Sequence, residues 1–202
     1  EAFHEMYNAI SIPIIYNGND EKKQFKFEGI KEGKINILFA GRIVEQKGIS
    51  VLSAVINKLN AHVNTFYFHI VGEGHLKEDL VKELGIFENV HFYGNVYNLA
   101  QYLHSFDFLF MPSVHEGLSM LSIESSFAKL PIIINSCEGL VDTVPNAWPL
   151  KVKDNNVDDF VEVFNNIKNL NRKVLAESAY QFVSDRFGIE QMQNQYIEYY
   201  KR

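Results

Sequence analysis

Short apolar runs that alternate with helical patterns are the feature that most constrains what this chain can fold into. The runs Ile35–Ala40 (INILFA), Asp107–Met111 (DFLFM) and Pro131–Ile134 (PIII) are short and mostly apolar, as expected of strands buried on both faces. After the first run, apolar residues recur on one helical face at Leu52, Val55, Ile56 and Leu59. Strands that alternate with helices predict an α/β domain with a Rossmann-like, doubly wound parallel sheet.

The remaining elements are expected from the same two patterns. Further strands are expected at Thr65–Val71, Val90–Tyr93 and Trp148–Val152, helices at His75–Leu84 and Val96–His104, and helix throughout Val157–Arg202. In this last stretch, Tyr196, Tyr199 and Tyr200 have the spacing of a buried helix face, or of a face that docks on a partner domain.

The loop Pro112–Leu118 lies between a buried strand and a helical pattern, where ligands bind in doubly wound sheets. Gly117 and Ser119 are both plausible entry residues of that helix, and the amides of Gly117 and Leu118 could hold a phosphate. Glu116 could accept hydrogen bonds from sugar hydroxyls. Glu124 lies about 80° and about 12 Å away if both residues are helical, so the two carboxylates indicate grips on an elongated, hydroxyl-rich ligand. The alternative is a helix N-terminal charge and a solvated helix residue.

The segment Gly41–Gly48 (GRIVEQKG) forms the expected loop after the first strand. Its cations, Arg42 and Lys47, suit a diphosphate, because arginine makes forked hydrogen bonds and lysine supplies a point charge. The alternative is two basic residues on a solvated loop. The segment VGEGHLK after the second strand has Lys77 where a dinucleotide fingerprint needs its third glycine, so we discount a nicotinamide or flavin cofactor.

Composition narrows the class of protein. A chain of 202 residues that is 47% hydrophobic can bury a full core, and a net charge of −6 without a basic stripe argues against nucleic-acid binding. The single cysteine, Cys137, excludes an internal disulfide and a cysteine metal cluster, and favours a reducing, cytosolic compartment. The sequence contains no apolar run near eighteen residues and no signal-peptide pattern.

The first 34 residues have the character of a domain junction. Glu1–Ile10 is typical of the tail of a helix, Ser11–Tyr16 of a short strand, and Glu21–Lys34 of a polar linker. Only Phe25, Phe27 and Ile30 anchor that linker. We therefore expect the chain to be the back half of a longer protein.

Five motifs follow one another along the chain: NG-x-D (Asn17–Asp20), GR-x4-KG (Gly41–Gly48), VGEG (Val71–Gly74), V-x-F-x-G (Val90–Gly94) and PS-x2-EG-x6-E (Pro112–Glu124). Taken in this order, they resemble the C-terminal, nucleotide-sugar-binding domain of retaining glycosyltransferases with the GT-B fold, family 4, also called glycosyl transferases group 1. The resemblance implies three parts: residues 1–34 as the end of a missing N-terminal domain and a linker, 35–185 as the nucleotide-sugar-binding domain, and 186–202 as a helix docked on the missing domain.

The resemblance also implies roles for single residues. Glu116, Arg42 and Lys47 would be catalytic: Glu116 faces the donor sugar, and the two cations neutralise the diphosphate. Glu124 would bind the ribose, and main-chain groups near 93–96 would bracket the base. The full set of implied donor contacts is Gly41, Arg42, Lys47, Gly72, Gly94, Asn95, Glu116, Gly117, Leu118 and Glu124. The resemblance implies no metal and no cofactor, the substrate being a UDP- or GDP-linked sugar.

The implied activity is transfer of a hexose, with retention, to a glycan or glycolipid acceptor in surface or capsular polysaccharide synthesis. The acceptor would bind through the missing domain, so the isolated chain is expected to be inactive. The expected location is cytoplasmic or at the inner face of the membrane, with at most peripheral association. Two alternatives stay open: a GT-B epimerase or hydrolase of nucleotide sugars, and a noncatalytic nucleotide-binding domain. Three residues depart from the family pattern: Ser125 replaces an alanine, Lys129 replaces a glycine, and Asp142 replaces a glutamate.

Overall fold

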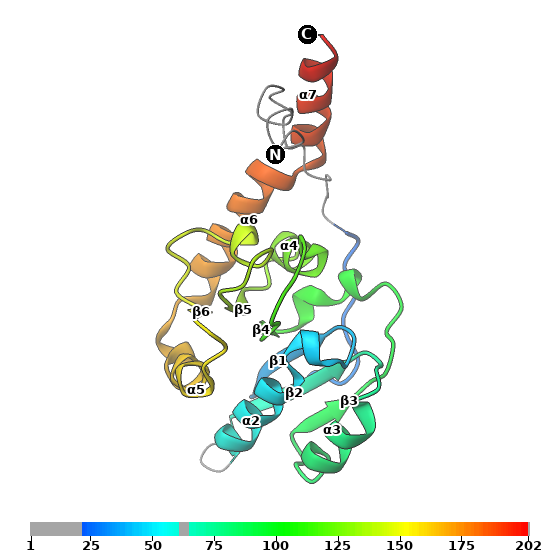
Figure 1. The fold of residues 1–202 in the computed structure, drawn as a ribbon, viewed down its shortest axis with the longest axis vertical. Coiled ribbons are helices and arrows are strands. Elements are labelled where there is room, and N and C mark those ends of the chain that lie inside the picture. Colours follow the sequence, from blue (N-terminus) through cyan, green and yellow to red (C-terminus); the bar gives the residue numbers. More distant parts are fainter. Residues whose placement is uncertain (1–21, 61–64, 202) are drawn as a thin grey trace, which may run out of the picture.

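A single parallel sheet organises the chain, and its strand order is β3-β2-β1-β4-β5-β6 (Figure 1). The computed structural model describes residues 22–60 and 65–201. The strands are β1 (Ile35–Ala40), β2 (Phe66–Val71), β3 (Val90–Phe92), β4 (Phe108–Met111), β5 (Ile132–Asn135) and β6 (Lys151–Val152). This order confirms the predicted Rossmann-like, doubly wound α/β class.

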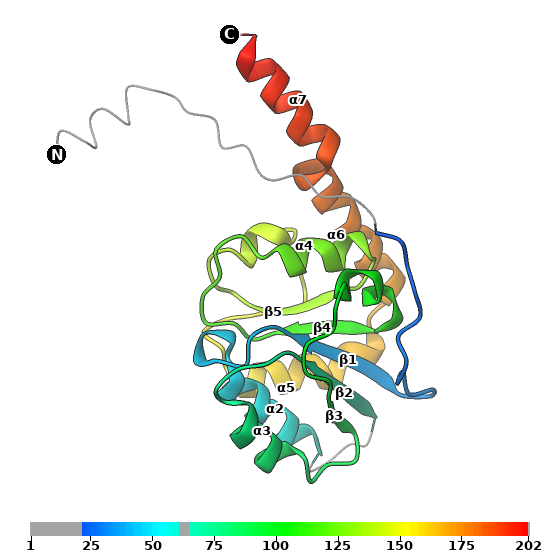
Figure 2. The same ribbon diagram turned by 90° about the vertical axis from the view of Figure 1, so that its right-hand side faces the viewer.

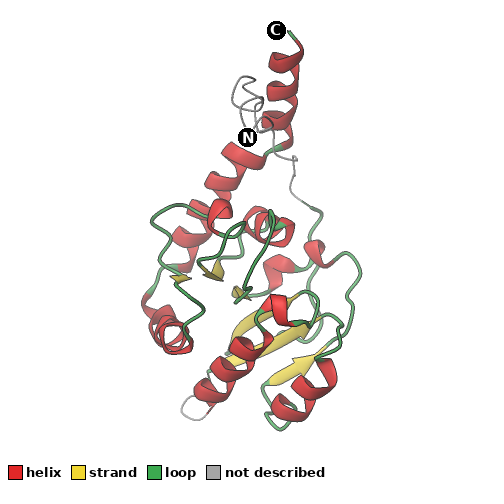
Figure 3. Cartoon of the chain, viewed as in Figure 1, coloured by secondary structure: helices red, strands yellow, loops and turns green. Residues whose placement is uncertain are grey.

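Helices cover both faces of the sheet. Figure 2 shows α2 (Ile49–Asn60), α3 (Lys77–Leu84) and α5 (Val157–Asn166) on one face, and α4 (Met120–Phe127) and α6 (Arg172–Phe187) on the other. Short 3-10 turns complete the connections: η1 (Glu45–Lys47), η2 (Leu99–Gln101), η3 (Leu103–Ser105), η4 (Val141–Thr143) and η5 (Ile167–Asn169) (Figure 3). Within the described ranges, no helix has the length and apolar character needed to cross a membrane.

The winding direction of the sheet reverses between β1 and β4. β1 pairs with β2 along its whole length, from Ile35 opposite Phe66 to Ala40 opposite Val71, and with β4 on its other side. In doubly wound sheets, the carboxyl ends of the two strands at such a reversal open a crevice, because the connections leave in opposite directions. The loops that follow β1 and β4 lie at this reversal point.

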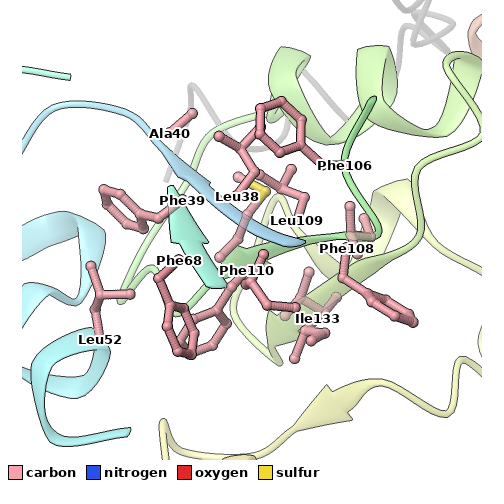
Figure 4. Close-up of a cluster of buried hydrophobic side chains, with 14 of the residues drawn as sticks. Leu38, Phe39, Ala40, Leu52, Phe68, Phe106, Phe108, Leu109, Phe110 and Ile133 are labelled. Atoms are coloured by element: carbon pink, nitrogen blue, oxygen red, sulfur yellow. The ribbon is translucent and has the colours of Figure 1, made fainter. Parts of the chain in front are cut away.

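The core fills both faces of the central strands, as the mostly apolar runs predict. Figure 4 shows Leu38, Phe68, Phe110 and their neighbours clustered about the sheet. Phe110 of β4 packs edge-on against Phe160 and Phe164 of α5, with ring centroids 5.0 and 5.2 Å apart. A second cluster joins α4 to α6 and consists of Ile123, Phe127, Val183 and Phe187. The frame that carries the β1 and β4 loops is therefore rigidly packed.

Three predicted elements differ from the structure. The expected helix at 96–104 is the pair of 3-10 turns η2 and η3, which begin after Asn98 in a left-handed conformation (φ 53°). The expected strand at 148–152 is reduced to Lys151–Val152, while the Trp148 indole N–H donates to the Ile132 carbonyl at 2.8 Å. The expected helix over 157–202 breaks before Asn171, the N-cap of α6, and again at Gly188.

The first and last described segments pack differently against the domain. Phe27 is buried, as the predicted linker anchor requires, and packs 5.1 Å from the ring of Tyr93. The motifs predicted before residue 22 lie outside the described residues. At the other end, α7 (Ile189–Tyr200) buries no residue and projects beyond α6 (Figures 1 and 2). Among the described residues the prediction of a buried tyrosine face is wrong, since Tyr200 is 80% exposed. Docking on another domain stays a prediction, as do the three predicted parts.

Candidate functional site

The loops after β1, β2 and β3 are joined by backbone hydrogen bonds at the carboxyl ends of these strands. The Gly41 N–H donates to the Val71 carbonyl at 3.0 Å, and the Gly72 N–H donates to the Gly94 carbonyl at 2.7 Å. The structure therefore brings these three predicted contact glycines together at the carboxyl ends of the strands. Asn95, the next residue, is exposed on the same connection.

The β1 loop is also joined to the β4 loop. The Val114 N–H donates to the Gln46 carbonyl at 2.9 Å, and the Gln46 side-chain amide donates to the His115 carbonyl at 3.1 Å. Gly48 makes this approach possible, because a Cβ there would stand 1.8 Å from the Pro112 carbonyl oxygen and its φ is +70°. The two loops that flank the reversal point thus form one surface.

Lys47 and Glu116 meet in this joined surface. The Lys47 Nζ lies 2.6 Å from Glu116 Oε1, and the Ser113 hydroxyl donates to the same oxygen at 2.8 Å. The Glu116 side chain is 9% exposed and that of Lys47 18%, so the ion pair is largely shielded from water. Both residues were predicted to contact a ligand. Their direct pairing was not predicted, because they lie 69 positions apart.

The other charged candidates lie around this pair. Arg42 is exposed, and its guanidinium contacts the Gln46 side-chain oxygen at 3.4 Å. Glu124 is half-buried on α4, whereas Glu116 is in the loop before it. The expected separation for two helical residues therefore does not apply, and the interpretation of Glu116 as a helix charge is wrong.

The helix after the β4 loop begins at the later of its two expected entry residues. Ser119 is its N-cap, and the side-chain oxygen accepts from the Ser122 N–H, so helical residues start at Met120. Gly117 and Leu118 lie in the loop before that start. A Cβ on Gly117 would meet no atom within 4 Å, so packing within the described chain does not require a glycine there.

The thiol of Cys137, just after β5, lies beside this site. Burial raises its pKa, and the Glu116 carboxylate raises it further, so the thiol stays protonated at neutral pH. Across the described residues, no three His, Cys, Asp or Glu side chains gather closely enough to hold a metal ion. The chemistry that the site offers is hydrogen bonding and charge: Lys47, Arg42, a carboxylate and loop amides.

Sequence reasoning missed the residues that support the β4 loop from β5 and β6. These are Asn135, a polar residue that ends an apolar strand, and Asn155, in the turn Asp154-Asn155. The available signals were weak: a buried strand rarely ends on a buried asparagine, and adjacent Asp and Asn residues favour tight turns.

A doubly wound sheet with two joined, charged loops at its reversal point defines a ligand-binding α/β domain of Rossmann-like type. The chain belongs to the family glycosyl transferases group 1, whose model matches residues 20–182. The family and the GT-B type of domain expected from the motifs are thereby confirmed.

Two curated relatives resemble most of the chain. The chain is 31% identical to an uncharacterised 41.2 kDa protein in the cps region of Klebsiella pneumoniae, over 94% of this chain and 55% of that protein. It is 28% identical to the O-antigen biosynthesis glycosyltransferase WbnH of Escherichia coli, over 91% of this chain and 60% of that one. The chain therefore spans little more than half the length of these relatives.

Solved structures share the fold. Sucrose-phosphate synthase from Thermosynechococcus elongatus matches all of this chain and 56% of its own, with a TM-score of 0.77 and 20% identity. HepE of Anabaena, solved in complex with UDP, matches 84% of this chain and 49% of its own, with a TM-score of 0.72 and 16% identity. At these identities the likeness concerns the fold alone.

Proposed function

We propose that this chain is the donor-binding part of a retaining glycosyltransferase that takes a hexose from a UDP- or GDP-linked donor. The acceptor is a glycan or glycolipid of a surface polysaccharide, and it binds to a part of the protein outside these residues. The observation that carries the proposal is the contact between Lys47 and Glu116 across the β1 and β4 loops. This contact places a cation and a carboxylate together at the sheet's reversal point, where such folds bind ligands.

The two cations suit a diphosphate leaving group. When the bond between the anomeric carbon and the diphosphate breaks, negative charge grows on the diphosphate oxygens. Lys47 and the exposed Arg42 of the same loop then stabilise the transition state more than the ground state. The partial burial of Lys47 strengthens this effect, because water screens its charge less.

The carboxylates suit hydroxyl groups at two ends of the donor. Glu116 faces the hexose and Glu124 the ribose, while the loop amides of Gly117 and Leu118 meet the phosphates. The empty position beside Gly117 supports this assignment, since a ligand can approach the backbone where no side chain of the protein does. The relatives WbnH, of O-antigen biosynthesis, and the cps-region protein support a surface polysaccharide as the product.

The test is thermal stability of this chain against UDP, GDP, ADP and their hexose conjugates. A ligand present at a hundredfold its dissociation constant adds about 2.7 kcal/mol of stability, which raises the melting temperature measurably. We expect one nucleotide family to do so, and Arg42→Ala and Glu124→Ala to lose the shift. Lys82→Ala and Glu190→Ala are matched controls, because both side chains are exposed on α3 and α7, away from the β1 and β4 loops.

Two outcomes would contradict the proposal. If both site variants keep the full shift in melting temperature, the ligand binds elsewhere on the chain. Product formed from donor without an acceptor, in a coupled assay on the longer protein, would favour an epimerase or hydrolase. We also expect no sugar transfer by the isolated chain; turnover by these residues alone would overturn the assignment of the acceptor to another part of the protein.

A further inference from the structure

Two asparagines outside the expected contact set hold the loop that carries Glu116. Asn135, the last residue of β5, is 6% exposed, and its side-chain Nδ2 donates to the Ser113 carbonyl at 2.9 Å. Asn155 lies after β6, and its Nδ2 donates to the Pro112 carbonyl, also at 2.9 Å. Two successive carbonyls of the β4 loop, those of Pro112 and Ser113, therefore accept hydrogen bonds from side chains at or just beyond the ends of two neighbouring strands.

The turn after β6 presents Asn155 to this loop. Asp154 and Asn155 both have left-handed backbone, with φ of 53° and 52°, a conformation that Asp and Asn adopt at little cost. The turn directs the Asn155 N–H to Asn135 Oδ1 at 3.0 Å. Because Oδ1 accepts this bond, the Asn135 amide nitrogen must face the Ser113 carbonyl, and each asparagine fixes the other.

Ser113 transmits this grip to the carboxylate. It is 1% exposed, and its hydroxyl donates to Glu116 Oε1 at 2.8 Å, the oxygen that also contacts Lys47. The other carboxylate oxygen, Oε2, takes part in neither contact. The arrangement therefore fixes the rotation of the carboxylate and leaves its second oxygen for another partner.

We propose that Asn135 and Asn155 are positioning residues of the donor site, which hold the β4 loop so that Glu116 presents Oε2 to the hexosyl group. The inference rests on the proposed function, since it needs a donor whose sugar meets Glu116. It makes a distinct demand: loss of the grip weakens binding of the sugar end, while the nucleotide end, bound elsewhere on the site, is retained.

The test is calorimetric titration of this chain with UDP and UDP-glucose, and with GDP and GDP-mannose. Asn155→Gly keeps the left-handed turn and its backbone N–H but removes the side-chain donor; Asn135→Leu removes the donor to Ser113. We expect each to raise the Kd of the preferred sugar conjugate about tenfold, the effect of one lost buried hydrogen bond, and to change the Kd of the nucleotide less than about twofold. Asp154→Gly, in the same turn with an exposed side chain, is the matched control.

Failure of the positioning role and failure of the donor site give different results. Equal weakening of nucleotide and conjugate, or no weakening, overturns the inference and leaves the donor site standing. An Asp154→Gly variant that reproduces the effect of Asn155→Gly assigns it to the turn backbone, and overturns the inference too. If the wild-type chain binds neither nucleotides nor conjugates at millimolar concentration, the proposed function fails first.

Discussion

The ion pair between Lys47 and Glu116 stabilises the fold and supplies the site with charge. Their side chains are only 18% and 9% exposed, so an isolated charge at either position would be poorly solvated. Each residue supplies the counter-ion that the other needs. Ser113 adds a hydrogen bond to the same oxygen. Removing one partner leaves a nearly buried charge unpaired, whereas removing both charges does not.

This pairing predicts strong energetic coupling between the two residues. Lys47→Met should lower the free energy of unfolding by about 2 kcal/mol, because Glu116 loses its counter-ion in a shielded position. The double variant Lys47→Met with Glu116→Gln should recover at least half of that loss. Urea unfolding of the wild type, both single variants and the double variant gives the coupling energy. Additive effects would show that the two side chains do not interact.

His69 is fully buried in β2 and links β1 to β3. Its Nε2 lies 3.0 Å from the Asn36 side-chain oxygen, and its Nδ1 lies 3.1 Å from the Tyr93 hydroxyl. The Asn36 oxygen accepts, so Nε2 carries the proton and Nδ1 accepts from Tyr93. Burial, and to a lesser extent His91, lowers the pKa of His69 from 6.5 to about 4.

The lowered pKa predicts a stability that depends on pH. The folded chain keeps His69 neutral where the unfolded chain protonates it, so the stabilisation is complete above about pH 6.5 and is lost as pH falls toward about 4. The loss attributable to His69 is up to about 3 kcal/mol. Urea midpoints at pH 7.5 and 5.0 measure it, with His69→Gln as comparison. If the variant shows the same pH dependence as the wild type, His69 is not responsible.

The end of α4 explains one departure from the family pattern. Lys129, where the family has glycine, adopts a left-handed backbone with φ of 55°, the conformation that glycine adopts most easily. Its Nζ pairs with Glu177 of α6 at 2.7 Å and lies over the Tyr180 ring at 4.6 Å. These contacts offset part of the backbone cost, so a lysine can end this helix.

Two substitutions at this position separate backbone from side chain. Lys129→Gly and Lys129→Ala both lose the contacts to α6, but only glycine relieves the left-handed strain. We expect the glycine variant to be about 1 kcal/mol more stable than the alanine variant, as measured by chemical unfolding. Alanine more stable than glycine, the order found inside helices, would contradict the left-handed conformation.

Features encoded by local patterns could be predicted, and those that depend on distant contacts could not. The run Ile35–Ala40 matches β1 residue for residue, because a strand buried on both faces leaves an unmistakable apolar run. The bond from Asn155 to Pro112 spans 43 positions and leaves no trace in spacing. The start of α4 could be narrowed only to Gly117 or Ser119 from the sequence, and the hydrogen bond of the Ser119 side chain decides between them.

The arrangement of the whole domain also limits what its sequence can reveal. The tyrosines of α7 have the spacing of a buried face, yet none of residues 22–60 and 65–201 covers them: Tyr199 is 46% exposed. An apolar helical pattern indicates that a face can be buried, but it does not indicate which element covers that face. The same holds for the site: Arg42 and Lys47 come from one loop and Glu116 from another, and only the folded sheet brings these loops together.

The most direct test of the donor site is amide hydrogen exchange of this chain with and without the nucleotide sugar that stabilises it most. We expect slower exchange in the β1 loop, Gly41–Gly48, and the β4 loop, Pro112–Leu118, because a ligand between them stabilises their closed state. Exchange in α7 should not change. Slower exchange only near the amino ends of the strands, around Lys31–Lys34, with both loops unaffected, would contradict a donor site at the reversal point.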